Sequence, residues 1–551
     1  MPKNFKQYGL LVWIFLVVTS CSEQKNKADL IIENAVIWTG NMEHIQAEAM
    51  AIRGDSILAI GSNDDIRKYK GEHTEVKNMA GKFVSPGFID AHVHLMMGGN
   101  ALLSVELRDA ATREEFIKRI ADYAKTLEPG SWILEGNWDH TLWGGELPRK
   151  EWIDQFTGKN PVVLYRLDGH MALANSLALE IAGINEDTPD IEGGEIVRDE
   201  KGFPTGILKD NAMSGLLNKI PPMTVPQKEK ALKAAMAYLV SNGVTSVHDV
   251  DSIGTYPIAK KLMDSNELVI RMYTLNPLNN WDTRDPTIRT NDKWLRTGGL
   301  KGFMDGSLGS HTAVFVDDYS DKPSVKGFFI NDKEDLYQWI LKADNADLQV
   351  AIHAIGDNAN HTLLNIFEKV IENNGPKNRR FRVEHAQHLL KEDIERFSKL
   401  GIVVSVQPYH AIDDGRWAEK AIGPDRIKTT YAFKSLLDAN VTLAFGSDWP
   451  VAPASPLYGI YAAVTRRTLD GANPNGWVPS EKIAVEQALL AYTRDAAYSS
   501  FDENRKGTLE IGKLADFVVL DGDVRSIDPV DIPKIKVLQT YVGGKLVYTR
   551  N

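Results

Sequence analysis

The chain of 551 residues contains one cysteine, Cys21. A single cysteine cannot form an intramolecular disulfide, and it excludes a zinc ribbon built on paired CxxC motifs. The sequence also lacks any run of basic residues, and its formal net charge is −11. This charge argues against a nucleic-acid partner, because proteins that bind nucleic acids carry basic patches that neutralise phosphates.

The chain has little in the way of long apolar runs. The run from Leu10 to Val18 is too short for a permanent membrane-spanning helix, which needs about 20 residues. Lys3 and Lys6 precede it and Thr19-Ser20-Cys21 follows, which is the layout of a secretory signal peptide. This ending resembles a bacterial lipobox, and the resemblance implies cleavage before Cys21 and lipid attachment to its sulfur. An ordinary secretory signal with an incidental cysteine remains the alternative.

We therefore predict a lipoprotein signal peptide over residues 1–20 and a polar tether over 21–28. The lipid on Cys21 would attach the protein to a membrane of the bacterial cell envelope. The predicted place is the outer membrane, on its periplasmic side or at the surface.

Hydrophobic residues make up 43% of the chain and charged residues 25%, which is ordinary globular usage and excludes a disordered chain. Short β-like runs lie within residues 29–84 and again within 505–551, separated by glycine, asparagine and aspartate turns. We expect these two ends to build one small, discontinuous β-sandwich domain. Between them, β-like runs alternate with helical patterns, which is typical of an α/β fold made of βα units.

Metal-ligand residue types stand at the ends of several β-like runs in this middle region. The run from Phe88 carries His92 and ends at His94, and residues two apart on a strand point to one side. Later runs carry Lys301, His353, His385 and Asp448. Any one of them could be a buried, hydrogen-bonded group, but five such runs in order are typical of a (β/α)8 barrel. In that fold the catalytic groups gather at the carboxyl ends of the strands.

Together, several strings resemble the amidohydrolase superfamily, and in particular its amidohydrolase-3 (YtcJ-like) branch, which includes N-substituted formamide deformylases. The strings are SPGFIDAHVH, DGHMALANS, GVTSVHD, KGFMDGSLGSHTA, AIHAIGD, VEHAQ, FGSDWPV and GKLADFVVLD. The resemblance covers about residues 29–549. It implies a TIM-type (β/α)8 barrel over 85–504, with a long insertion at about 96–242.

The number of strands can be checked against this implied barrel. Runs at 244–249 and 269–275 supply strands 2 and 3, and a run at 403–408 supplies strand 7. With the five ligand-bearing runs they make eight. The β-like run at 162–167 is left outside the barrel.

The resemblance further implies a binuclear metal centre. Its ligands would be His92, His94, Lys301, His353, His385 and Asp448. The implied cofactors are two divalent ions, with zinc first and manganese or iron as alternatives, and carbon dioxide that converts Lys301 to a bridging carbamate. A plain Lys301 beside a single ion remains the alternative.

The expected activity is hydrolysis of a non-peptide carbon–nitrogen bond, of N-acyl or formamide type, in a small amide-like molecule. A metal-activated hydroxide would attack, and Asp448 would act as general acid and base. Two other functions stay open: a mononuclear deaminase-type or other hydrolase of the same superfamily, and a non-catalytic envelope binding protein. The oligomeric state also stays open, including a homodimer.

Three further residues are predicted to bind substrate. His170 follows a β-like run, His248 ends strand 2, and Asp305 shares a strand face with Lys301 on the two-residue period. His410 lies in a loop after strand 7 and ranks below them.

Two more expectations concern the immediate surroundings of the ligands. Side chains alternate between the two faces of a strand, so Glu384 is predicted to lie on the face opposite to His385 and to point away from the site. Gly446 shares a phase with Asp448, which predicts that it leaves room for ions inside the barrel.

Overall fold

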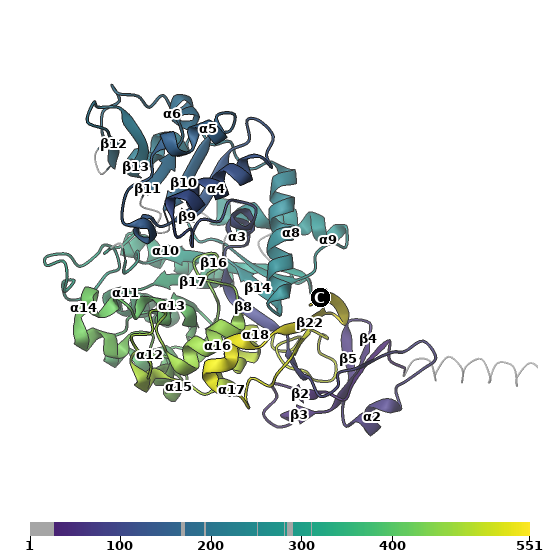
Figure 1. The fold of residues 1–551 in the computed structure, drawn as a ribbon. Coiled ribbons are helices and arrows are strands. Elements are labelled where there is room, and N and C mark those ends of the chain that lie inside the picture. Colours follow the sequence, from purple (N-terminus) through teal and green to yellow (C-terminus); the bar gives the residue numbers. More distant parts are fainter. Residues whose placement is uncertain are drawn as a thin grey trace, which may run out of the picture. The chain divides into compact units, whose positions relative to one another are not determined.

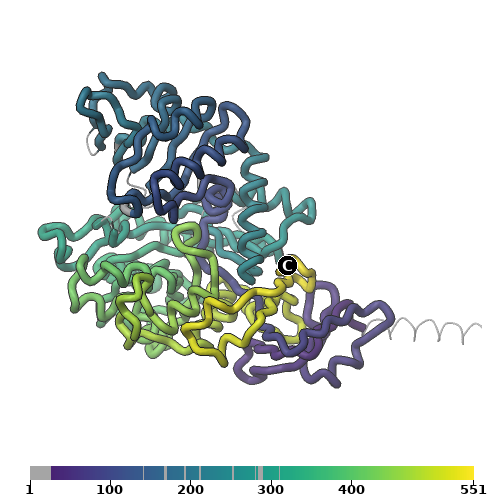
Figure 2. Tube along the Cα trace, in the orientation of Figure 1, coloured from purple at the N-terminus to yellow at the C-terminus, as the bar shows by residue number. Residues whose placement is uncertain are grey.

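The structure is a computed structural model that describes residues 27–166, 171–191, 194–250, 252–279, 281–283, 290–309 and 311–550. The predicted signal peptide, Cys21 and His170 lie outside the described residues. Contacts divide the chain into two compact units, one of residues 1–94 with 236–551 and the other of residues 95–235. The two units are described separately, and Figure 2 traces the path of the chain through each of them.

In the described part of the first unit, eight parallel strands form one sheet in the order β20-β19-β18-β17-β16-β15-β14-β8. The strands are β8 (Phe88–Val93), β14 (Val244–Asp249), β15 (Arg271–Pro277), β16 (Leu295–Phe303), β17 (Gln349–Ala354), β18 (Arg382–His385), β19 (Val403–Val406) and β20 (Thr442–Phe445). This order follows the chain, so the sheet curls into a nearly closed barrel. The predicted barrel and its strand count are confirmed.

The barrel strands form because both of their faces are covered. Every residue of β8, β14, β18 and β19 is buried, which is typical of parallel strands enclosed by helices. The first and last strands meet just beyond their ends, where the His94 N–H donates to the Trp449 carbonyl at 2.9 Å. The Asp448 N–H likewise donates to the His92 carbonyl at 2.7 Å.

Helices of the first unit follow the barrel strands and cover the sheet (Figure 1). They are α9 (Ser252–Asp264), α10 (Lys333–Asn345), α11 (Asp357–Asn374), α12 (Ile394–Lys399), α13 (Pro408–Asp414), α14 (Ala418–Arg426), α15 (Phe433–Asp438), α16 (Pro456–Thr465), α17 (Val485–Ala491) and α18 (Arg494–Ser499). α8 (Val225–Ser241) runs across the boundary between the two units. Asp332 starts α10 by accepting hydrogen bonds from the Glu334 and Asp335 N–H groups.

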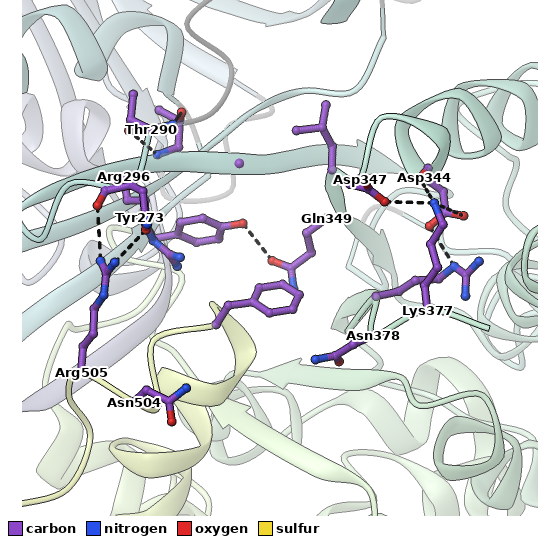
Figure 3. Close-up of a pocket in the computed structure, with 16 residues that line it drawn as sticks. Tyr273, Thr290, Arg296, Asp344, Asp347, Gln349, Lys377, Asn378, Asn504 and Arg505 are labelled. Atoms are coloured by element: carbon purple, nitrogen blue, oxygen red, sulfur yellow. Dashed lines mark hydrogen bonds and ion pairs between the residues drawn. The ribbon is translucent and has the colours of Figure 1, made fainter. Parts of the chain in front are cut away.

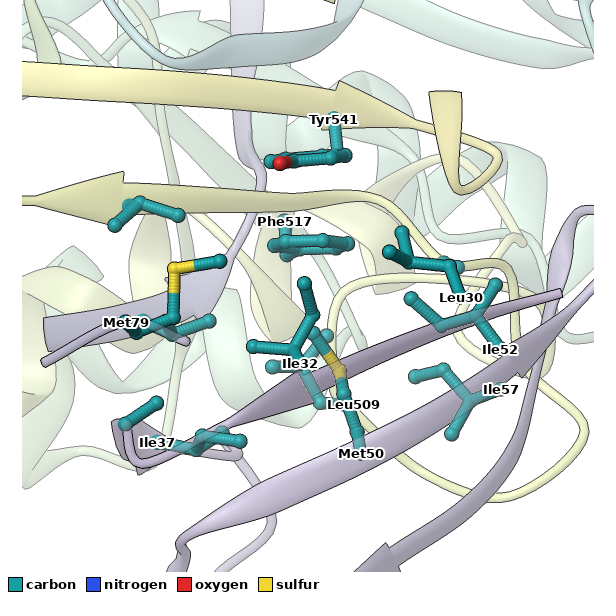
Figure 4. Packing of buried hydrophobic residues seen from close by; sticks show 14 residues of the cluster. Leu30, Ile32, Ile37, Met50, Ile52, Ile57, Met79, Leu509, Phe517 and Tyr541 are labelled. Carbon is teal, nitrogen blue, oxygen red and sulfur yellow. The ribbon is translucent and has the colours of Figure 1, made fainter. Parts of the chain in front are cut away.

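The two ends of the chain build two further sheets in the described residues. One has the order β5-β4-β1-β6, from β1 (Leu30–Glu33), β4 (Ala49–Arg53), β5 (Ser56–Gly61) and β6 (Glu75–Asn78), with α2 (Asn63–Arg67) beside it. The other has the order β23-β22-β21-β7-β2-β3, from β2 (Val36–Trp38), β3 (Gln46–Ala47), β7 (Phe83–Pro86), β21 (Phe517–Leu520), β22 (Val537–Val542) and β23 (Lys545–Thr549). The two sheets share one hydrophobic core, in which the Phe517 and Tyr541 rings stack 4.3 Å apart (Figure 4).

The second unit has a sheet of its own. In the described residues its order is β12-β13-β11-β10-β9, from β9 (Ile133–Trp138), β10 (Val162–Arg166), β11 (Met171–Ala174), β12 (Gly194–Arg198) and β13 (Pro204–Asp210). Its helices are α3 (Leu95–Leu102), α4 (Arg113–Ala124), α5 (Asp154–Thr157), α6 (Ser176–Ala182) and α7 (Ser214–Leu217). Residues 162–166 of the predicted run therefore belong to this sheet and not to the barrel, and residue 167 lies outside the described residues. Among the described residues, no helix has the length and apolar character needed to cross a bilayer.

A buried ion pair joins the barrel to the C-terminal β segment. Arg271 begins β15, and its Nε lies 2.6 Å from Asp516 Oδ2. Both side chains are almost fully buried, and Asp516 also accepts a hydrogen bond from the Gly543 N–H. Each charge in this position depends on its partner, because isolated charges are costly away from water.

The first prediction concerns this pair. We expect Asp516→Asn to lower the free energy of unfolding by about 3 kcal/mol, because Arg271 stays buried without an opposite charge. Denaturation by urea, followed by tryptophan fluorescence, measures the change. Lys434→Met removes the exposed pair with Asp438 and serves as the control, with an expected effect below about 1 kcal/mol. Equal effects of the two substitutions would contradict the prediction.

Candidate metal centre

Two histidines and an aspartate meet where the barrel closes. His94 Nε2 lies 3.2 Å and His92 Nε2 3.5 Å from Asp448 Oδ1. One ligand atom from each of the three residues lies within 4.8 Å of the others. His92 Nε2 is buried and has no hydrogen-bond partner among the described residues. Buried nitrogen lone pairs that converge on a carboxylate suit a divalent cation, so these donors fit a metal ion.

The junction between β8 and β20 holds this triad in place. Asp90 accepts hydrogen bonds from the Ser447 N–H and hydroxyl and from the His92 N–H. Gly446 lies against the same backbone, where a Cβ atom would be 2.6 Å from the His92 nitrogen. The prediction that Gly446 leaves room for ions is therefore wrong. Its missing side chain lets the backbone of β8 approach.

Glu384 points into the barrel, so the prediction that it faces away is wrong. It is fully buried, and its Oε2 lies 2.6 Å from His92 Nδ1. The rule of alternation fails because His385 and Ala386 have φ values of 74° and 42°, which end the extended backbone after Glu384. His385 turns into the site at this bend, and Glu384 keeps its place inside the strand. Arg382 holds the carboxylate with contacts of 2.7 and 3.1 Å.

The hydrogen bonds made by Nδ1 determine which ring nitrogen of His92 and His385 has a free lone pair for a metal ion. The carboxylate of Glu384 can only accept, so His92 donates from Nδ1 and keeps its lone pair on Nε2. His385 Nδ1 lies 2.7 Å from the amide oxygen Oε1 of Gln407, which is also an acceptor. His385 therefore also presents Nε2. Such outer hydrogen bonds fix the orientation and tautomer of metal-binding histidines.

The histidines of the cluster are held neutral by burial. Burial, aided by the charge of Lys301, lowers the pKa of His92 to about 4 and that of His353 to about 3. Burial and the neighbouring imidazoles likewise hold the pKa of His385 well below its usual value. At neutral pH these rings carry lone pairs, which is the form that binds metals.

His353 and Lys301 belong to the same cluster. The ring centroids of His92 and His353 lie 4.8 and 4.5 Å from that of His385. His353 donates from Nε2 to the Gly306 carbonyl at 3.0 Å, which leaves its lone pair on Nδ1. Lys301 is buried on β16, and burial lowers its pKa to about 8. The six predicted ligands thus lie on the barrel strands or at their ends, and their roles as ligands remain predictions.

The residues predicted to bind substrate have other contacts in the structure. Asp305 is fully buried and accepts hydrogen bonds from the N–H groups of Val314, Ile355 and Gly356, so it ties together the loops after β16 and β17. His248 is fully buried, and its Nδ1 accepts from Arg382 at 3.0 Å. These contacts give both residues a role in positioning. His170 lies outside the described residues.

The amidohydrolase family model Amidohydro_3 matches residues 75–548. The chain belongs to the amidohydrolase family. It is a metal-dependent hydrolase that acts on carbon–nitrogen bonds, and its substrate is a small molecule.

Relatives of this amidohydrolase span nearly its whole length. It is 42% identical over 540 residues to the protein LONG AFTER FAR-RED 3 of Arabidopsis thaliana, covering 95% of this chain and 92% of that protein. It is 32% identical to the putative amidohydrolase YtcJ of Bacillus subtilis (94% and 98% covered) and 28% identical to the N-substituted formamide deformylase of Arthrobacter pascens (95% and 98%). The crystal structure of an uncharacterized metal-dependent hydrolase from Pyrococcus horikoshii is similar, with 28% identity, a TM-score of 0.77 and coverage of 91% and 99%.

His410 is the site residue of the amidohydrolase that the sequence ranked too low. Ligand atoms of His385, His410 and Asp448 lie within 4.8 Å of one another. His410 Nε2 is buried and has no hydrogen-bond partner in the described part of the chain. The signal in the sequence was its place directly after strand 7, at the carboxyl end of the barrel.

The amidohydrolase also has a cavity of about 880 Å³ away from this cluster (Figure 3). Tyr273 and Gln349, which line it, lie near the amino ends of β15 and β17, opposite the end that carries the ligands. Its cations are paired, for example Lys377 with Asp347 at 3.0 Å. This cavity is therefore separate from the histidine cluster.

The second prediction concerns Glu384. We expect Glu384→Gln to weaken the binding of divalent metal about 10- to 100-fold, because the uncharged amide no longer fixes the His92 imidazole and leaves Arg382 without its partner. Competition with a chelating dye at constant pH measures the affinity. Glu481→Gln is the matched control, since Glu481 is also buried but binds Ser435. Unchanged affinity in Glu384→Gln would contradict the proposed dependence.

Proposed function

We propose that this amidohydrolase cleaves a non-peptide carbon–nitrogen bond, of N-acyl or formamide type, at a binuclear metal centre. The observation that carries the proposal is the place of Asp448, whose carboxylate is shared by two groups of candidate ligands. His92 and His94 form one group with it, and His385 lies in the other, whose remaining member, His410, is not one of the proposed ligands. The similarity to an N-substituted formamide deformylase supports the substrate class.

The proposed ligands are His92, His94, Lys301, His353, His385 and Asp448. Neutral imidazoles and carboxylates suit zinc, and they also accept manganese or iron. When bound, two such ions would lower the pKa of a water molecule and polarise a substrate carbonyl. The lone pairs on His92 Nε2, His385 Nε2 and His353 Nδ1 are the donors available for this purpose.

Lys301 needs a chemical change before it can act as a ligand, because an ammonium group has no lone pair. We propose that its neutral amine attacks carbon dioxide. A nitrogen–carbon bond forms, the nitrogen loses one proton to solvent, and the product is a carbamate anion. Burial supports this step, since a pKa of about 8 leaves a fraction of the amine neutral at physiological pH.

Asp448 is the proposed general acid and base. It takes a proton from the attacking water as the new oxygen–carbon bond forms. It then gives that proton to the nitrogen as the carbon–nitrogen bond breaks, so the products are a carboxylic acid and an amine. The hydrogen bond from its N–H to the His92 carbonyl and its φ of 60° hold the residue at the mouth of the barrel.

The third prediction tests this function. We expect two ions per wild-type chain by elemental analysis after growth with zinc and bicarbonate, and release of formate from N-butylformamide or of amine from p-nitroacetanilide. Lys301→Ala should lose at least one ion. Asp448→Asn should lower kcat by about 1000-fold, since it cannot carry the proton.

The control for metal content is Lys506→Met, which removes another buried lysine, one that binds Ser246. It should keep two ions. One ion per chain in both the wild type and Lys301→Ala would contradict the binuclear centre and favour a mononuclear enzyme.

We also propose that the protein is held in the bacterial cell envelope by a lipid on Cys21. The support is the order of the N-terminal residues, in which two lysines, a short apolar run and small residues precede the cysteine. A body without further cysteines is compatible with an oxidising compartment.

The fourth prediction follows from this anchor. In a bacterial host, the wild-type chain should incorporate labelled palmitate and sediment with the membranes. Cys21→Ala should take up no label, because the sulfur that receives the lipid is gone. Ser22→Ala is the matched control and should behave as the wild type. Label that persists in Cys21→Ala would contradict the anchor.

A further inference from the structure

We propose that His410 is a catalytic residue that donates a hydrogen bond to the oxygen of the scissile carbonyl. The inference rests on the proposed hydrolysis and adds a residue that the family resemblance leaves unassigned. The inference follows from the position of the His410 imidazole, from the residues around it and from the absence of a hydrogen-bond partner for its Nε2 among the described residues.

The position of His410 is fixed relative to His385. α13 begins at Pro408, directly after β19, and a proline suits the first turn of a helix. The His410 N–H donates to the Gln407 carbonyl at 3.1 Å, and the side chain of Gln407 holds His385 Nδ1. One short segment therefore places both histidines at the carboxyl end of the barrel.

The ring of His410 lies close enough to two proposed ligands for one atom to contact all three residues. One of its nitrogens lies within 4.8 Å of ligand atoms of His385 and Asp448. Two polar atoms at such a separation can share a third atom about 2.8 Å from each. His410 is only 8% exposed, and its Nε2 lacks a hydrogen-bond partner among the described residues. A buried ring nitrogen is normally satisfied, and this ring lies beside two of the proposed ligands, which together point to a bound group there.

Two carboxyl groups lie near His410. Asp448 lies on one side of the ring, and Asp414 follows one turn later on α13. Burial raises the pKa of Asp414, and the nearby His410 acts in the opposite direction. The Tyr431 hydroxyl donates to Asp414 and holds it there. Because the six proposed ligands are other residues, the unpartnered Nε2 of His410 can carry a hydrogen and donate it to a carbonyl oxygen.

The chemistry of the step requires no proton from His410. As the water oxygen bonds to the carbonyl carbon, the π electrons move to the carbonyl oxygen. The N–H of His410 stabilises this negative charge more strongly than it stabilises the uncharged carbonyl, so the hydrogen bond accelerates the reaction. When the carbon–nitrogen bond breaks, the electrons return and the carbonyl reforms.

The fifth prediction compares two variants of His410. His410→Leu removes the donor, and we expect kcat/KM for N-butylformamide to fall about 100-fold. His410→Gln keeps an amide N–H at a similar reach, and its loss should stay below about tenfold. Both variants should retain two ions per chain. His388→Asn is the control, because His388 is also a buried histidine but binds Thr430.

A second measurement is independent of turnover. Acetohydroxamate has a carbonyl oxygen that the proposal would place beside His410, and its Kd can be read from the visible spectrum of the cobalt-loaded protein. We expect about tenfold weaker binding in His410→Leu and nearly wild-type binding in His410→Gln. Loss of an ion in His410→Leu would make His410 a metal ligand and overturn the proposal. Unchanged kcat/KM and Kd would overturn it as well.

The two proposals fail in different ways. A wild-type protein that holds two ions but hydrolyses neither amide contradicts the proposed function. The Kd for acetohydroxamate in His410→Leu and His410→Gln then still decides whether His410 donates to an oxygen at this place.

Discussion

The candidate metal centre depends on one buried ion pair, between Arg382 and Glu384, in the interior of the barrel. Neither side chain has any exposed surface. A carboxylate alone in such a place would take up a proton, because burial opposes its charge. Arg382 overcomes that effect and holds the pKa of Glu384 far below its usual value. Glu384 therefore stays charged and fixes the tautomer of His92, so the free lone pair on His92 Nε2 follows from this ion pair.

The same guanidinium also joins the strands that carry the centre. Arg382 stands on β18 and donates to the Ala91 carbonyl on β8, to the Ser405 hydroxyl on β19 and to His248 on β14. A buried arginine is costly unless all its hydrogens find acceptors, and here the acceptors come from four strands. The packing of the barrel and the orientation of the histidine are thus parts of one network. This explains how the site can be rigid before any ion binds.

The sequence predicted the barrel because apolar runs and their polar ends repeat in a fixed order, and each strand is buried on both faces. It could not predict Glu384, since the two-residue period holds only while the backbone stays extended, and His385 departs from it. It ranked His410 too low because the nearness of His410 to Asp448 comes from the pairing of β19 with β20 and from the path of the segments that follow them, which no local pattern records. By the two-residue period Asp305 falls on the same strand face as Lys301, but β16 ends before Asp305. Its carboxylate therefore accepts hydrogen bonds from the loops.

Charge balance explains why Lys301 is suited to the proposed centre. In the barrel interior Arg382 offsets Glu384, and the ammonium of Lys301 interacts favourably with the nearby Asp448, which lowers the cost of burying these charges. Two divalent ions beside an ammonium would be repelled. The proposed carboxylation would replace that positive charge by a negative one, and by linkage each ion that bound would favour the carbamate in turn. On this proposal, folding would not have to bury the anionic ligand, which would be stabilised when the ions bind.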